Sequence, residues 1–260
     1  MSFFRSAQRF LVCSSLAYVI LKTFFLTGLL TEYVQQIILF SFIAILTSLG
    51  LNVIYGYTGQ FSLGHAGFYG IGAYTAAYLG AVFKVESVIA FLPILFLGGA
   101  AAGLLGYIVG IPILRLSDDF LAIATLGFGI LIRVLLDNSD RFIEVLGGSR
   151  GFIGIPKIVN LEVAFCTVVF LILVTRNLIF SRYGLLWQCI KDDELASTVF
   201  GINTARMKLM AFTYGCFLAG IGGALYAHYQ EVVSNEGFGI DRSIVFLAMV
   251  IFHLPRRIIS

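Results

Sequence analysis

Seven apolar stretches of membrane-spanning length dominate the sequence and limit the folds open to it. A helix that crosses a membrane needs about 20 mostly apolar residues. The stretches that come close are 10–30, 37–55, 64–83, 88–110, 119–136, 161–180 and 207–228. An eighth begins near Ser243 and gives way to a Pro-Arg-Arg segment at Pro255. We therefore expect an all-α, polytopic transmembrane helical bundle with about seven full spanning helices and a partial eighth.

Composition supports one membrane domain and no soluble one. Hydrophobic residues make up 59% of the 260-residue chain and charged residues 12%, whereas soluble domains carry about 25% charged residues. The net charge of +3 is small and dispersed, which argues against a nucleic-acid partner. We expect residues 1–260 to form a single transmembrane domain in contact with lipid.

Positive residues predict the orientation of the chain, because short cytoplasmic loops are enriched in Lys and Arg. Arg5 and Arg9 place the N-terminus in the cytoplasm, and we expect the first helix to be retained rather than cleaved as a signal peptide. The same side then holds 56–63, 111–118 and 181–206, whereas 137–160, on the other side, is more basic than the rule expects. Arg133 is expected to snorkel to an interface.

A glycine-rich run separates the second and third apolar stretches. Residues 56–75 contain six glycines, and glycine permits both unusual dihedrals and close helix contacts. The polar residues of this region are Asn52, Thr58, Gln60, Ser62 and His65. Either they form a hydrophilic lining or re-entrant element of a translocation path, or they belong to a cytoplasmic turn in which Ser62 caps a helix.

Small residues recur at close-packing intervals in two of the later stretches. Gly99 and Gly103 are followed by Gly106 and Gly110, and a second stripe holds Gly215, Ala219 and Gly222. Such stripes let helices approach closely within a membrane. We favour packing within the chain over an interface with a partner subunit.

No constellation of catalytic or metal-ligating residues is present in the sequence. His65, His228 and His253 lack the spacing of a metal site, and no serine lies in a G-x-S-x-G turn. The phosphate-binding pattern G-x-x-x-x-G-K-[ST] is also missing. We expect no enzymatic activity, no metal and no bound cofactor, so any ATP used would be hydrolysed by partner subunits.

The polar segment before the last long stretch has the pattern of a short amphipathic helix. Ile190, Leu195, Val199 and Ile202 recur at helical spacing with charges between them, and Gly201 can end the helix. Such a helix can lie on the membrane surface or fit a groove of a partner. The pattern leaves both alternatives open.

Four ordered motifs resemble the inner-membrane permease subunits of ABC importers for branched-chain amino acids, in the LivM-like branch. The most specific is 56–66, Gly-Tyr-Thr-Gly-Gln-Phe-Ser-Leu-Gly-His-Ala. The others are 120–128, 147–149 with 154–156, and 224–229. The resemblance extends from about Asn52 to Ala248 and implies a permease domain that translocates these amino acids.

The resemblance also implies a role for the cytoplasmic loop at about 181–207. This loop is similar to the coupling helix that docks into an ATPase subunit, with Glu194, Ala196 and Gly201 matching the family pattern. Ser197 and Thr198 depart from it. The expected ATPase-coupling residues are Lys191, Asp192, Asp193, Glu194, Ala196 and Gly201.

The implied partners are a second related permease subunit, two cytoplasmic ATPase subunits, and a periplasmic or surface-attached substrate-binding protein. The glycine-rich segment 146–156 either gates the path, meets the binding protein, or is a plain connector. The change of sequence after Ile251 predicts a truncated C-terminus with reduced stability or assembly. Alternative functions are a permease for urea, short amides or other amino acids, and a truncated membrane protein that does not transport.

Overall fold

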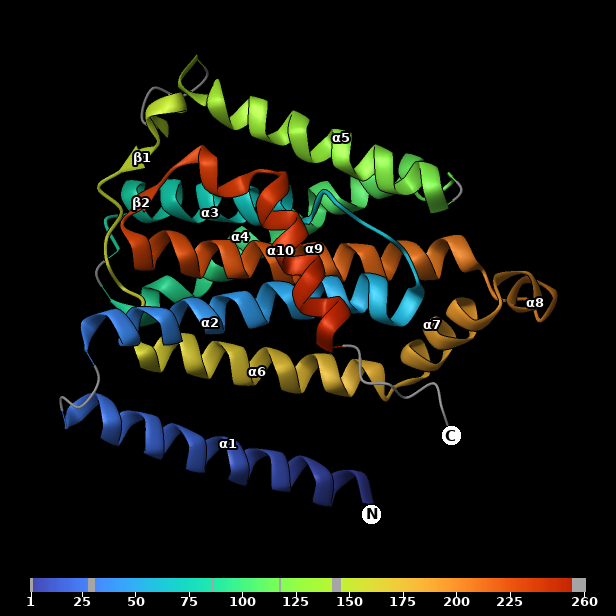
Figure 1. Ribbon diagram of the computed structural model, residues 1–260, viewed down its shortest axis with the longest axis horizontal. Helices are drawn as coiled ribbons and strands as arrows, with labels where there is room; N and C mark the ends of the chain where they lie inside the picture. The colour runs from blue at the N-terminus through green and yellow to red at the C-terminus, as the bar shows by residue number, and fades with distance from the viewer. Residues whose placement is uncertain (1, 28–30, 86, 117, 142–145, 254–260) are drawn as a thin grey trace.

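The computed structural model describes residues 2–27, 31–85, 87–116, 118–141 and 146–253, and it is almost entirely helical (Figure 1). Its α-helices are α1 (Ser2–Leu26), α2 (Glu32–Leu51), α3 (His65–Val82), α4 (Val88–Ile113), α5 (Asp118–Asp137), α6 (Leu161–Ile179), α7 (Arg182–Asp192), α8 (Glu194–Val199), α9 (Thr204–Gln230) and α10 (Ile240–His253). A π-helix, η1 (Asn52–Tyr57), extends α2. Short 3-10 turns are η2 (Ser139–Arg141), η4 (Gly148–Arg150) and η5 (Asn235–Phe238), and two strands are β1 (Phe152–Ile153) and β2 (Val232–Val233). The all-α prediction is confirmed.

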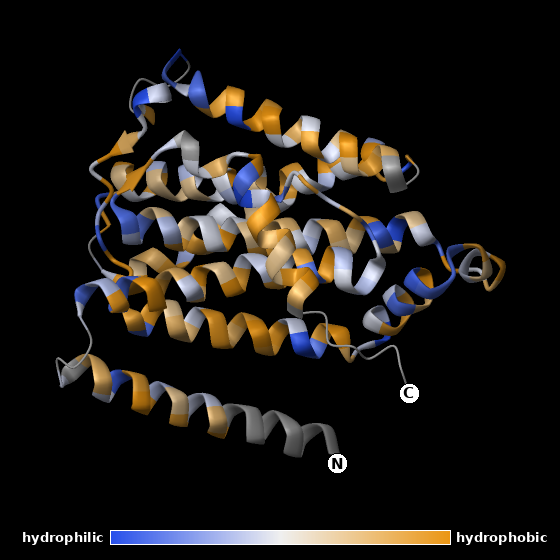
Figure 2. Cartoon of the chain, in the orientation of Figure 1, coloured by the Kyte–Doolittle hydropathy of each residue, from blue (hydrophilic) through white to orange (hydrophobic). Residues whose placement is uncertain are grey.

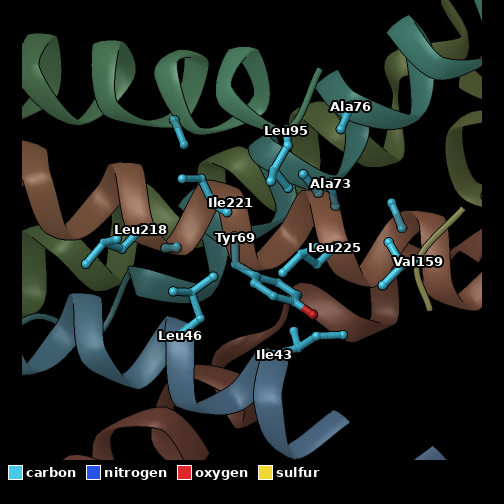
Figure 3. Packing of buried hydrophobic residues seen from close by; sticks show 14 of the residues in the cluster. Ile43, Leu46, Tyr69, Ala73, Ala76, Leu95, Val159, Leu218, Ile221 and Leu225 are labelled. Carbon is cyan, nitrogen blue, oxygen red and sulfur yellow. The ribbon is translucent and has the colours of Figure 1, made fainter. Parts of the chain in front are cut away.

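Helix α9 forms the centre of the bundle and packs against α2, α3 and α4. Figure 3 shows this core, in which Leu218, Ile221 and Leu225 of α9 lie around Tyr69. Small residues bring the helices close: a Cβ added at Gly106 would lie 2.7 Å from the Cβ of Cys216 on α9. The small-residue stripes therefore serve packing within the chain, as predicted.

The loops gather at two opposite ends of the bundle (Figure 1). One end, here called the α8 end, holds α7, α8 and the start of α1. The other, the hairpin end, holds the antiparallel pair β1–β2. Figure 2 shows mostly hydrophobic helices between these ends and more hydrophilic residues at them. This distribution is typical of a membrane bundle, and the chain is a multi-pass membrane protein.

Each of the eight apolar stretches forms a helix, but the helices differ in their ability to cross a membrane. By length and composition, five qualify among the described residues: Glu32–Tyr57, Val88–Ile113, Phe120–Asp137, Leu161–Ile179 and Thr204–Gln230. Helix α10 has 14 residues and runs across the direction of the other helices (Figure 1). The predicted change of sequence at the C-terminus falls mainly on 254–260, outside the described residues.

Candidate functional site

The glycine-rich run folds back into the bundle instead of forming a turn at its end. Nε2 of His65, the first residue of α3, lies 3.1 Å from the carbonyl oxygen of Thr47 on α2. Thr47 precedes Tyr57 by ten residues, so the chain returns roughly 15 Å along α2–η1 before α3 begins. We call 58–64 the re-entrant segment. It has the geometry that the sequence offered as one of two alternatives.

Neighbouring helices hold the inner end of the re-entrant segment. The backbone N–H of Leu63 donates to Oγ1 of Thr125 on α5 over 3.1 Å, and the N–H of Ala66 donates to Oγ of Ser243 on α10, also over 3.1 Å. A Cβ added at Gly64 would lie 2.1 Å from the carbonyl oxygen of Thr125. Only glycine permits this approach, which explains why the motif needs it.

The predicted path residues differ in whether their side chains form hydrogen bonds. Thr58, Gln60, Ser62 and His65 are all buried. Thr58 Oγ1 donates to the carbonyl oxygen of Ile54 over 2.6 Å, so it serves the end of η1. Among the described residues, both amide atoms of Gln60, Oγ of Ser62 and Nδ1 of His65 have no hydrogen-bond partner. Buried polar groups of this kind are costly and concentrate at functional sites.

Ser62 does not cap α3, contrary to the alternative that the sequence allowed. The N-cap residue is Gly64, which has no side chain, and Ser243 from α10 satisfies the first turn instead. Ser243 is 177 residues from Ala66 in the sequence, so the sequence around α3 contains no pattern that would predict this hydrogen bond. Asn52, the fifth predicted path residue, is half-buried at the start of η1. Its Oδ1 lies 2.0 Å from the position that a Cβ at Gly56 would take, so the side chain of Asn52 occupies the space that glycine leaves open.

A lysine of the predicted coupling loop contacts the end of η1. Nζ of Lys191 on α7 donates to the carbonyl oxygen of Gly56 over 2.7 Å. A helix C-terminus carries partial negative charge and unpaired carbonyl groups, so a cation is favourable there. The coupling loop and the re-entrant segment, predicted separately, are therefore linked by one hydrogen bond.

The coupling loop contains two helices where the sequence predicted one amphipathic helix. Asp193 leaves the helical conformation, with φ −157° and ψ 107°, and its carboxylate accepts a hydrogen bond from the N–H of Ala196 over 2.9 Å. This N-cap starts α8 in a new direction. Ile190 is consequently buried in α7, whereas Leu195 and Val199 are 78% and 85% exposed, so the predicted single apolar face is wrong.

Helix α8 presents an apolar tip at the α8 end of the bundle. Leu195, Val199 and Phe200 are its large exposed side chains. Glu194 ties α8 to α9 through an ion pair with Lys208, with Oε2 and Nζ 2.6 Å apart. Gly201 follows with a φ of +81°, the left-handed conformation that the predicted helix stop requires. Asp192 ends α7, so all six predicted coupling residues lie on or next to these two helices.

The glycine-rich connector at the hairpin end is a constrained structure. Gly147, Gly148, Gly151 and Gly154 all have positive φ. The N–H of Ile155 donates to the carbonyl oxygen of Glu231 over 3.3 Å, and the hydrogen bond and charge of the Glu231 side chain raise the pKa of Lys157. The connector is therefore fixed against the end of α9.

A cavity of about 250 Å³ lies between the start of α3, α5 and the start of α10. Apolar side chains and glycines form most of its wall, and Arg133 and Ser243 are its polar side chains. Its lining includes Leu63 and Gly67, which places it beside the re-entrant segment. Sequence reasoning assigned Arg133 to the interface and missed Thr125 and Ser243, because their roles arise only from helix packing.

The described part of the chain contains no cluster of His, Cys, Asp or Glu that could hold a metal ion. What the arrangement offers instead is a polar segment inside an apolar bundle and a linkage from that segment to an exposed helix. These features can guide a small solute and transmit movement.

Comparison with known proteins identifies the family. Residues 33–259 match the family described as branched-chain amino acid transport system / permease component. Over 243 residues the chain is 35% identical to the high-affinity branched-chain amino acid transport system permease protein LivM of Salmonella typhimurium and to that of Escherichia coli. It is 26% identical over 230 residues to the probable branched-chain amino acid transport permease protein LivH of Methanocaldococcus jannaschii.

These alignments cover most of this chain but less of the relatives. The LivM alignments take in 80% of this chain and 56% of each relative, and the LivH alignment takes in 82% and 71%. No solved structure matches the chain. The matched family is one of transport permeases and not of enzymes. The chain therefore belongs to the branched-chain amino acid transport system permease family.

Proposed function

We propose that this chain is a permease subunit of an ABC importer that moves branched-chain amino acids across the inner membrane. The observation that carries the proposal is the re-entrant segment, which places buried polar side chains within an apolar bundle. Each such group is costly in a membrane unless it serves a solute, water or a partner. The LivM and LivH relatives are named as branched-chain amino acid transport permeases, which supports the choice of cargo.

In this proposal ATP is hydrolysed by two partner subunits, and the chain itself binds no cofactor. The apolar tip of α8 is the docking element, because Leu195, Val199 and Phe200 offer hydrophobic anchors at the α8 end. The Glu194–Lys208 ion pair transmits movement of α8 to α9. The hydrogen bond from Lys191 transmits movement of α7 to η1 and the re-entrant segment.

The orientation follows from this assignment. The α8 end faces the cytoplasm, which also places the N-terminus there, and the hairpin end faces the binding protein. The fixed connector with β1 and the Lys157–Glu231 ion pair provides a rigid surface for that contact. A second related permease completes the path. Residues 1–260 act as a single permease domain.

The experiment that tests the proposal is uptake of radiolabelled leucine by cells that contain the partner subunits, with and without this chain. We expect chain-dependent uptake that unlabelled isoleucine or valine reduces and that urea does not. Inhibition by urea with no effect of isoleucine would assign a short amide as the cargo. Loss of chain dependence, with the protein in the membrane, would refute the proposal.

Docking is tested separately by co-purification with the ATPase subunits. Phe200→Ala removes an 83% exposed side chain, so a loss of co-purification reports a lost contact and not a lost core residue. Phe180→Ala is the matched control, because Phe180 is also an exposed phenylalanine and lies outside α8. Equal co-purification of both variants would contradict docking through α8.

A further inference from the structure

The cavity beside the re-entrant segment is lined by one charged side chain, that of Arg133. Arg133 lies on α5 four residues before the helix ends at Asp137, about 6 Å from the hairpin end of that helix. No carboxylate lies within ion-pair distance of its guanidinium in the described part of the chain. Arg133 lies in a membrane-spanning helix and part of its side chain is exposed beside the cavity, and an arginine at that depth is expensive unless it meets water, an anion or a partner.

The cavity follows one face of α5. Leu126, Gly129, Ile130 and Arg133 line it and recur at intervals of three and four residues. From Leu126 to Arg133 the helix rises about 10 Å. The wall is thus apolar near the re-entrant segment and charged near the hairpin end.

The opposite wall adds a hydroxyl group and further apolar surface. Phe238 and Ile240 line the cavity together with Ser243, which is buried. Oγ of Ser243 accepts the hydrogen bond from Ala66, so its own hydrogen remains available to an acceptor. A ligand that suits this site has an anionic group at one end and an aliphatic body.

We infer that this cavity is a subsite of the translocation path that receives an aliphatic amino acid, with Arg133 binding its α-carboxylate. The apolar wall by Leu63, Leu126 and Ile130 receives the side chain. Guanidinium groups bind carboxylates through charge-assisted, often bidentate hydrogen bonds. The inference rests on the proposed function and names the residue that recognises the substrate.

The test uses the complete complex, with its partner permease, ATPases and binding protein, in vesicles. Arg133→Gln is expected to lower leucine uptake about tenfold or more, the factor for one lost charge-assisted hydrogen bond. Arg133→Lys keeps the charge and is expected to retain most of the uptake. Arg141→Gln is the matched control, because Arg141 is exposed at the same end and does not line the cavity.

Chemical restoration of the charge separates substrate binding from a structural role. Arg133→Cys is prepared with Cys13, Cys166 and Cys189 replaced by Ser, because these cysteines are exposed. A methanethiosulfonate reagent that carries an ammonium group is expected to restore uptake, and one that carries a sulfonate is not. Equal recovery with both reagents would overturn the inference.

The remaining outcomes are distinguishable from one another. If the wild-type complex takes up no leucine, the proposed function fails. If wild type and Arg133→Gln take up leucine equally, only the subsite fails. Loss of partner permease from the Arg133→Gln complex would assign Arg133 to a subunit contact. Uptake that depends on phosphatidylglycerol in wild type and not in Arg133→Gln would assign it to lipid headgroups. Either result would overturn the subsite.

Discussion

Replacing Gly72 by alanine is expected to destabilise the bundle, because α3 and α9 meet there without room for a side chain. A Cβ added at Gly72 would lie 2.1 Å from the carbonyl oxygen of Gly220 and 2.3 Å from its Cα. Real Cβ contacts are rarely shorter than 3.4 Å, so the two backbones must separate by about 1.3 Å, the difference between 3.4 and 2.1 Å. Both contacting atoms belong to the backbone of Gly220, so rotation of a side chain cannot relieve the clash.

The expected cost follows from two opposing effects. Overpacking a well-packed core costs about 1–3 kcal/mol, and a backbone clash lies at the upper end of that range. Alanine regains up to about 1 kcal/mol through helix propensity. The net loss is about 2 kcal/mol, and at roughly 2–4 °C per kcal/mol for a chain of this size the melting temperature falls by roughly 4–8 °C.

The assay is the melting temperature of the detergent-solubilised chain, followed as the fraction that remains monodisperse after heating. Gly127→Ala is the matched control, because no atom of the described residues lies within 4 Å of a Cβ placed at Gly127. We expect the control to match or slightly exceed the wild type. A Gly72→Ala protein as stable as the Gly127→Ala protein would refute the close crossing of α3 and α9.

Two further predictions concern function. Lys191→Met removes the hydrogen bond to Gly56 and is expected to reduce ATP-driven uptake several-fold while ATPase activity continues. Arg182→Met serves as the control, because Arg182 lies at the exposed start of α7 and does not make this hydrogen bond to Gly56. Parallel loss of uptake and ATPase activity would contradict a transmission role. Gln60→Leu removes a buried amide that has no hydrogen-bond partner in the described part of the chain, so stability is expected to be unchanged or higher while uptake falls. Unchanged uptake would contradict a place in the path.

The helices could be predicted from the sequence because membrane spans depend on local composition. The stretch 161–180 became α6, Leu161–Ile179, and 119–136 became α5, Asp118–Asp137. The glycine-rich run also indicated a break. The run alone does not show whether the chain turns outside the bundle or re-enters it. Re-entry depends on contacts with Thr125 and Ser243, which lie far away in the sequence.

The candidate site was predicted only in part, for the same physical reason. Gln60 and Ser62 stood out because polar residues are rare near spans, and both are buried with no hydrogen-bond partner among the residues that the structure describes. The link from Lys191 to Gly56 joins positions 135 residues apart in the sequence. The break at Asp193 was missed because a helical spacing of apolar residues, here Ile190 and Leu195, does not reveal an N-cap between them.

The most direct test of the central claim is the accessibility of the re-entrant segment during the transport cycle. Ser62→Cys, close in size to the native residue, is introduced into the complex with Cys13, Cys166 and Cys189 replaced by Ser, and labelled with a small water-soluble thiol reagent. Labelling is expected to change with ATP and with leucine-loaded binding protein, while the buried native Cys216 stays unlabelled. A Ser62→Cys site that is unreactive in every state of an actively transporting complex would contradict the claim that this segment lines the path.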